Sequence, residues 1–238
     1  MKRSLFARSM AGSLVATLLV VASCLTSTIA NAQESVPLSE LLDGGSIGSG
    51  DKLFDQFSYS ASGDMPDSTG VNVIPIVDDD GNFGIRFQGA FLDLYSTDGD
   101  RGSDALIGFT VSVTDPERLI SDAHLMGNPN LLGADVGSIS VTETFGFDAT
   151  GAHQLNIFDD EGAGTLLRDW TLFDQPRSAL IVLKDINAFA AEQGSVTLSF
   201  VDQTFSQIGT PVVPEASTGL LMLLGLATLA ATRRARRQ

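Results

Sequence analysis

The feature that most constrains the fold is a two-residue alternation of side chains near the middle of the chain. From Ala105 to Thr114 the sequence reads ALIGFTVSVT, and one side of the alternation consists of Ile107, Phe109, Val111 and Val113. A period of two residues places the two sets on opposite faces of an extended strand. The segment is therefore predicted to be a half-buried β-strand, which Asp115-Pro116 ends.

Turn-forming residues divide the neighbouring sequence into further short strands. Asp78-Asp79-Asp80-Gly81-Asn82 carries an Asp-Gly pair between two apolar segments, which predicts a β-hairpin. We expect strands at 53–60, 71–77, 83–88, 91–95, 138–145, 153–158, 165–173, 179–183 and 196–205, and a short helix at 186–193. Strands about ten residues apart without regular helices between them favour an all-β, antiparallel β-sandwich, jelly-roll-like in form, over an up-and-down barrel.

The N-terminal segment 1–32 has the three parts of a secretory signal peptide. Lys2, Arg3 and Arg8 form a basic region, residues 10–25 are apolar, and Ala30-Asn31-Ala32 offers a cleavage site before Gln33. This predicts export through the Sec translocon and cleavage by signal peptidase. An alternative is the lipobox-like sequence Val21-Ala22-Ser23-Cys24, in which Cys24 would be lipidated. Cleavage after Ala32 removes the only cysteine, so no disulfide can form in the mature chain.

The C-terminal segment 213–238 contains a short apolar run closed by basic residues. Residues 218–232 carry no charge and would form a helix of about 22 Å, whereas a bilayer core is about 30 Å thick. The run is followed by Arg233, Arg234, Arg236 and Arg237, which orient a membrane segment with its C-terminus in the cytoplasm. A short single transmembrane helix is therefore predicted.

This C-terminal segment resembles the PEP-CTERM sorting signal of Gram-negative bacteria. The sequence Val213-Pro214-Glu215-Ala216-Ser217-Thr218 matches the usual V-P-E-P-S-T opening except at Ala216, where the second proline is expected. The resemblance implies that a membrane-embedded exosortase recognises the segment and processes the chain near this motif. The stretch 104–145 also resembles the bodies of other PEP-CTERM proteins of unassigned function. The alternative to a processed sorting signal is that segment 213–238 is a permanent membrane anchor.

The remaining domain, residues 33–212, is strongly acidic. It contains seven basic and 28 acidic residues, a net charge of −21, whereas the whole chain carries −15. Such a surface argues against binding nucleic acid or anionic lipid headgroups. It suits solubility outside the cell and is able to attract divalent cations.

No segment of the domain carries a specific catalytic motif. Gly44-Gly45-Ser46-Ile47-Gly48 fits the G-x-S-x-G pattern of hydrolases, but it lies in a Gly/Ser-rich stretch instead of a strand–turn–helix unit. His124 and His153 are the only histidines of the whole chain, and neither belongs to a zinc-binding pattern. The chain is therefore predicted not to be an enzyme.

One loop has the composition of a weak cation site. Asp98, Asp100 and Asp104 alternate with glycine and serine, and carboxylates spaced in this way can converge on Ca²⁺. The loop departs from the EF-hand pattern at its glycine and lacks the final glutamate. Asp and Gly are also the commonest turn formers, so a structural turn is the favoured interpretation, here and at the similar acidic turns 78–80 and 159–161.

Two functions remain after these exclusions. The first is an exported, exosortase-sorted protein of the cell surface or extracellular matrix, without catalysis, which acts in adhesion, biofilm or polysaccharide binding. The second is a secreted hydrolase that uses two carboxylates on a polysaccharide. Aromatic residues that could stack on sugars are few, and the strand-like setting of Trp170 favours a core position over a groove.

Overall fold

The computed structural model of the chain describes residues 34–97, 102–133, 137–147, 153–191 and 194–210. The predicted signal peptide and the predicted sorting signal, with their cleavage and arginine residues, lie outside these ranges. Within them, no helix is long and apolar enough to cross a membrane.

The described residues form two antiparallel sheets, as predicted from the strand pattern. Sheet A has the order β1 (Val36–Pro37), β4 (Asn72–Val77), β5 (Phe83–Leu94), β14 (Ser195–Phe205), β7 (Arg118–Gly127) and β12 (Arg168–Arg177), with β8 (Asn130–Leu132) on β14 and β15 (Gln207–Gly209) on β7. Sheet B has the order β11 (Gly164–Leu166), β10 (Leu155–Asp160), β9 (Gly137–Phe145), β13 (Ala179–Ala190), β6 (Ser103–Val113), β3 (Lys52–Ser62) and β2 (Ile47–Ser49). The helical elements among the described residues are short: α1 (Leu38–Leu41) and the 3₁₀ turn η1 (Ser68–Gly70).

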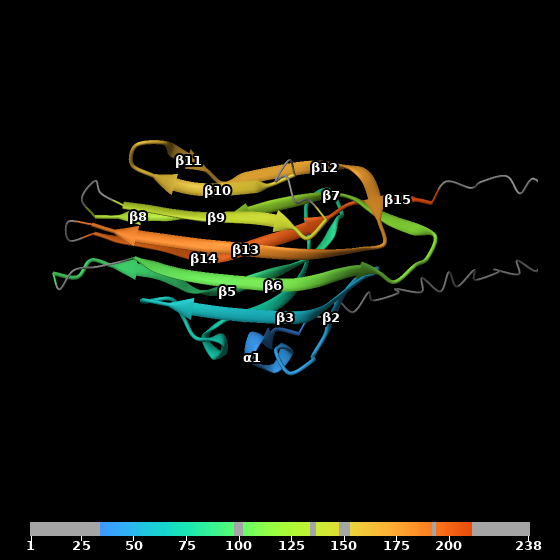
Figure 1. Ribbon diagram of the computed structural model, residues 1–238, viewed down its shortest axis with the longest axis horizontal. Helices are drawn as coiled ribbons and strands as arrows, with labels where there is room; N and C mark the ends of the chain where they lie inside the picture. Colours follow the sequence, from blue (N-terminus) through green and yellow to red (C-terminus); the bar gives the residue numbers. More distant parts are fainter. Residues whose placement is uncertain (1–33, 98–101, 134–136, 148–152, 192–193, 211–238) are drawn as a thin grey trace, which may run out of the picture. The chain divides into compact units, whose positions relative to one another are not determined.

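The two sheets pack face to face as a β-sandwich. Figure 1 shows them one behind the other, with β13 over β14 and β6 over β5. The chain crosses between sheets repeatedly, for example from β5 to β6 and from β13 to β14. No ladder joins the sheets in the described ranges, so the barrel alternative does not apply.

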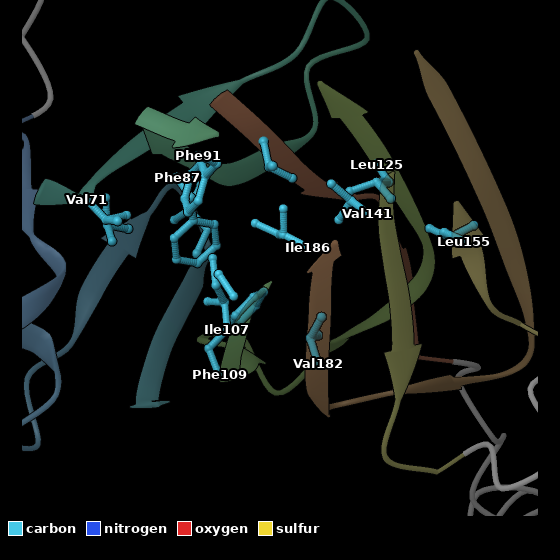
Figure 2. Close-up of a cluster of buried hydrophobic side chains, with 14 of the residues drawn as sticks. Val71, Phe87, Phe91, Ile107, Phe109, Leu125, Val141, Leu155, Val182 and Ile186 are labelled. Atoms are coloured by element: carbon cyan, nitrogen blue, oxygen red, sulfur yellow. The ribbon is translucent and has the colours of Figure 1, made fainter. Parts of the chain in front are cut away.

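The core lies between the sheets and is built from alternate residues of each strand. Figure 2 shows Phe87 and Phe91 of sheet A meeting Ile107 and Phe109 of sheet B, and all four are at most 2% exposed. The Phe87 and Phe109 rings are 5.7 Å apart, a normal separation for a packed aromatic pair. The alternation that predicted a strand at 105–114 therefore also predicted which side chains face the core.

Four predicted elements are corrected by the structure. The helix expected at 186–193 is wrong for residues 186–190, which continue strand β13. There, Ile186, Ala188 and Ala190 are buried, while Phe189 is 45% exposed, so burial alternates with the two-residue period of a strand. Because the run is short and mostly apolar, its sequence does not reveal this period. The strand expected at 165–173 is divided at Leu167, where the chain leaves sheet B and enters sheet A as β12. The strands expected at 83–88 and 91–95 are one strand, β5, whose pairing with β14 shifts register between them.

Strand β7 was not predicted at all, although it lies between β14 and β12. Its polar residues obscure the alternation, because Ser121 is buried beside Ile120 and faces Ser206 across the sheet. Apolar periodicity identifies a strand only where the buried side chains are apolar.

Candidate functional site

A groove with a volume of about 430 Å³ lies on sheet A. It is bordered by residues 76–80 at the β4–β5 turn and by side chains from four adjacent strands, β5, β14, β7 and β12. We call this feature the sheet A groove.

Strand register explains how residues far apart in sequence meet in the sheet A groove. One row of paired residues crosses β5, β14, β7 and β12 and consists of Arg86, Asp202, Met126 and Arg168. The next row begins at Gly84 of β5 and continues with Thr204, His124 and Trp170. Their neighbours along each strand, such as Phe87, Val201 and Ala123, are buried in the core. Because successive side chains alternate between faces, the two rows lie on the outer face of sheet A.

Trp170 provides the aromatic surface of the groove. Its side chain is 64% exposed, so the predicted core position is wrong. The indole and the His124 ring are nearly parallel, at 23°, with centroids 6.4 Å apart. Trp170 lies on β12, the last strand in the order of sheet A, and faces away from the core. The prediction failed because alternation in the sequence does not reveal which face of a strand is covered.

Arg86 and Asp202 form a charged pair in the groove, joined by two hydrogen bonds. Arg86 Nε donates to Asp202 Oδ1 at 2.6 Å and Nη2 donates to Oδ2 at 2.7 Å. The hydrogen bond to Asp202 raises the pKa of Arg86, although partial burial opposes it. The guanidinium also lies 4.1 Å from the centroid of the Phe200 ring. Two parallel hydrogen bonds and a stacked ring hold this guanidinium in one orientation.

Asp78 orders the turn at the edge of the groove. Its carboxylate accepts hydrogen bonds from the backbone N–H groups of Asp80 and Asn82 and from the hydroxyl of Thr204. Burial alone would raise the pKa of Asp78, but these hydrogen bonds, led by that from Thr204, lower it overall. The structural-turn interpretation of this acidic segment is therefore confirmed. In the same way, Asp160 accepts hydrogen bonds from Gly162 and Ala163 in the turn between β10 and β11.

Asp122 holds His124 in place beside Trp170. Asp122 Oδ1 lies 3.2 Å from His124 Nε2, and the same oxygen accepts a hydrogen bond from the Ser206 backbone at 2.9 Å. The hydrogen bond to Asp122 raises the pKa of His124 against partial burial. Burial would raise the pKa of Asp122, but the hydrogen bonds from His124 and Ser206 lower it.

Of the predicted calcium residues, the one that the structure describes does not line the groove. This residue, Asp104, lies on β6 of sheet B, whereas Asp98 and Asp100 fall outside the described residues. Burial raises the pKa of Asp104, and a hydrogen bond and the charge of Asp185 add to the effect. In the part of the chain that the structure describes, no three His, Cys, Asp or Glu side chains are arranged to hold a metal ion.

The G-x-S-x-G segment lacks the setting of a catalytic elbow. Gly44 follows helix α1, and the segment continues directly into strand β2 at Ile47 instead of a helix. His153, another of the sequence candidates, packs against the rings of Phe147 and Phe173, and its ring centroid is 5.7 Å from each of theirs.

Comparison with known proteins gave structural similarities alone. No family model matches the chain, and no curated protein matches it. Similar solved structures include TmCBM61 in complex with beta-1,4-galactotriose (10% identity, 62% of this chain and 88% of that chain, TM-score 0.26). The xylan-binding module CBM15 is similar at 13% identity over 73% of this chain and 97% of that chain, with a TM-score of 0.26.

A third similar structure is the enzymatically active domain of tailspike protein 4 of bacteriophage CBA120. It is 14% identical over 63% of this chain, which spans 19% of the tailspike chain, with a TM-score of 0.25. Similarities at these scores carry no argument about function.

Proposed function

We propose that residues 33–212 form a polysaccharide-binding domain that acts outside the cell without catalysis. The observation that carries the proposal is the exposed Trp170 ring, set among fixed hydrogen-bonding side chains in a groove on a rigid sheet. The sheet A groove is the binding site in this proposal.

A sugar ring needs two kinds of contact from a protein. Its C–H groups form an apolar face that packs on an aromatic ring, and its hydroxyl groups both donate and accept hydrogen bonds. Trp170 supplies the aromatic face. Arg86 and Asp202 supply a donor and an acceptor group, and their paired hydrogen bonds hold them in place before a ligand arrives. Side chains ordered in advance reduce the entropy lost on binding.

The carboxyl groups favour binding over hydrolysis. A hydrolase needs one carboxylic acid whose pKa is raised so that it can protonate the leaving group. In the groove, the pKa of Asp78 is lowered, because hydrogen bonds stabilise its carboxylate. Where a carboxyl pKa is raised among the described residues, at Glu143 and Asp104, the group lies in sheet B and does not line the groove.

Trp170→Ala tests the binding site directly. Loss of a central aromatic contact costs about 2 kcal/mol, so we expect the dissociation constant for the bound polysaccharide to rise roughly thirtyfold. Affinity electrophoresis on a panel of neutral polysaccharides, followed by calorimetry, provides the measurement. Leu172→Ala is the matched control, because Leu172 lies on the same strand and is 61% exposed but does not line the groove.

Equal affinities for Trp170→Ala and the unchanged protein would remove the groove from the proposal. The hydrolase alternative predicts release of reducing ends from the same polysaccharides. Turnover that disappears in Asp202→Asn would replace binding with catalysis as the function.

Export and sorting remain part of the proposal on the strength of the terminal sequences. We expect the mature chain to begin at Gln33 and to lose its C-terminal arginines in cells that contain the exosortase. Mass spectrometry of both termini, in strains with and without the exosortase, measures this. A mature N-terminus at Cys24 would indicate a lipoprotein, and identical C-termini in both strains would indicate a permanent anchor.

A further inference from the structure

Three polar side chains meet in the core between the two sheets, away from the surface groove. Lys184 comes from β13, Glu143 from the neighbouring strand β9, and Gln203 from β14 of the opposite sheet. All three residues have 0% exposure. Lysine and glutamate are almost never fully buried, so this cluster needs an explanation.

Lys184 is in direct contact with both partners. Its Nζ atom hydrogen-bonds Glu143 Oε2 and Gln203 Oε1. The other Glu143 oxygen, Oε1, is buried without a hydrogen-bond partner among the described residues. The amine therefore lies against a side-chain carbonyl, beside a carboxyl group that retains an unused oxygen.

The side chains next to the cluster on the adjacent strands are apolar, although the charges of Asp169 and Asp202 act on Glu143 and Lys184. The cross-strand neighbours are Ile107 beside Lys184, Leu155 beside Glu143, and Ile85 and Leu125 on either side of Gln203. Each of them is at most 1% exposed. Burial lowers the pKa of Lys184 and raises that of Glu143, so both shifts favour a neutral amine beside a neutral carboxylic acid.

We propose that Lys184 and Gln203 form an intramolecular isopeptide bond, with Glu143 as the catalytic acid and base. A neutral, desolvated lysine is a nucleophile, and a primary amide is an acceptor that can release ammonia. The fold holds the amine against the amide carbonyl, which replaces a slow encounter with a fixed geometry.

The reaction balances without a cofactor or an oxidant. Nζ of neutral Lys184 attacks Cδ of Gln203. The neutral Glu143 carboxylic acid donates its proton to Nε2 of Gln203 and takes one proton from Nζ, the Cδ–Nε2 bond breaks, and ammonia leaves. The product is one Nζ–Cδ amide bond, and Glu143 ends in its starting protonation state.

The bond would link the two sheets covalently. Lys184 belongs to sheet B and Gln203 to sheet A, and cleavage after Ala32 leaves the domain without any cysteine for a disulfide. A cross-link between the layers restricts the unfolded chain as a disulfide does. Unlike a disulfide, it would be unaffected by reductants.

Mass spectrometry of the full chain tests the proposal. The expected intact mass is lower by one ammonia than the mass of the unlinked chain with the same termini. After denaturation and trypsin digestion, we expect no cleavage after Lys184 and one peptide that joins the segments around 184 and 203. Cleavage after Lys52 is the internal control, because Lys52 is also buried at 1% exposure but is paired only with Asp51 among the described acidic residues.

Glu143→Gln should restore both the unlinked mass and trypsin cleavage after Lys184, whereas Glu117→Gln, an exposed acidic position, should leave the link intact. An unlinked mass with complete cleavage after Lys184 in the unchanged protein would overturn the proposal. A mass lower by one water would overturn the assignment of Gln203, because it would mean that Lys184 condenses with a carboxyl group.

Discussion

Single residues of the groove are fixed by partners that the sheet brings from distant parts of the sequence. Arg86 and Asp202 are 116 positions apart, yet they are direct partners across β5 and β14. Asp122 joins His124 on its own strand to Ser206, which follows β14. These pairs orient the donors and acceptors that surround Trp170.

The Asp122–His124 pair should make stability depend on pH. The pKa of His124 is raised in the folded protein, so its contribution is complete below the unfolded value of about 6.5 and is lost as the pH rises through the raised value. The pKa of Asp122 is lowered, so its contribution is lost only as the pH falls through that lowered value. Between the lowered pKa of Asp122 and the raised pKa of His124, both side chains are charged.

His124→Gln should therefore destabilise the domain below about pH 6 more than above about pH 8, as measured by urea denaturation. Asp122→Asn is the matched variant and should remove the same pH dependence. A His124→Gln cost that is equal at both pH values would show that the ion pair does not stabilise the fold.

At the level of elements, close backbone contact joins β5 to β14 at Gly84. A Cβ atom at this position would lie 2.7 Å from the Thr204 Cα atom and closer still to the Gln203 carbonyl oxygen. Backbone atoms cannot rotate away as a side chain can. The pairing that carries Arg86, Asp202 and Thr204 into the groove therefore depends on a residue without a side chain.

Gly84→Ala should destabilise the domain by about 3 kcal/mol, since overpacking against backbone must separate the strands. Gly48→Ala is the control, because its Cβ would meet its nearest atom at 3.9 Å within strand β2. Thermal unfolding of the two variants gives the comparison. Similar melting temperatures would mean that β5 and β14 can shift apart without cost.

At the level of the whole molecule, charge restricts the class of polysaccharide. Residues 33–212 carry a net charge of −21, and the groove has five aspartates against Arg86 and Arg168. An anionic chain would be repelled by both the surface and the site. A neutral ligand gains its affinity from packing and hydrogen bonds, which salt screens little.

We therefore expect neutral polysaccharides to bind with a dissociation constant that changes less than about twofold between low and high salt. Uronate-rich polysaccharides should not bind at low salt. Calorimetry at two ionic strengths measures both. Tight binding of a uronate-rich polysaccharide would place recognition outside the groove.

The sequence by itself determined the local structure of this protein. Alternation at 105–114 and the Asp-Gly turn at 81 predicted strands and a hairpin, because strand faces and turn conformations depend on a few adjacent residues. The acidic balance was also evident without a structure. Where buried positions are polar, as along β7, or an apolar run is short, as at 186–190, the same rules failed.

Only the tertiary structure decided which residues meet. Trp170 lies in a groove instead of the core because β12 presents it on the outer face of sheet A, a choice that strand alternation leaves open. Arg86 and Asp202, and equally Lys184, Glu143 and Gln203, come together through strand order and sheet packing. Those contacts join distant segments, and no local pattern of residues specifies them.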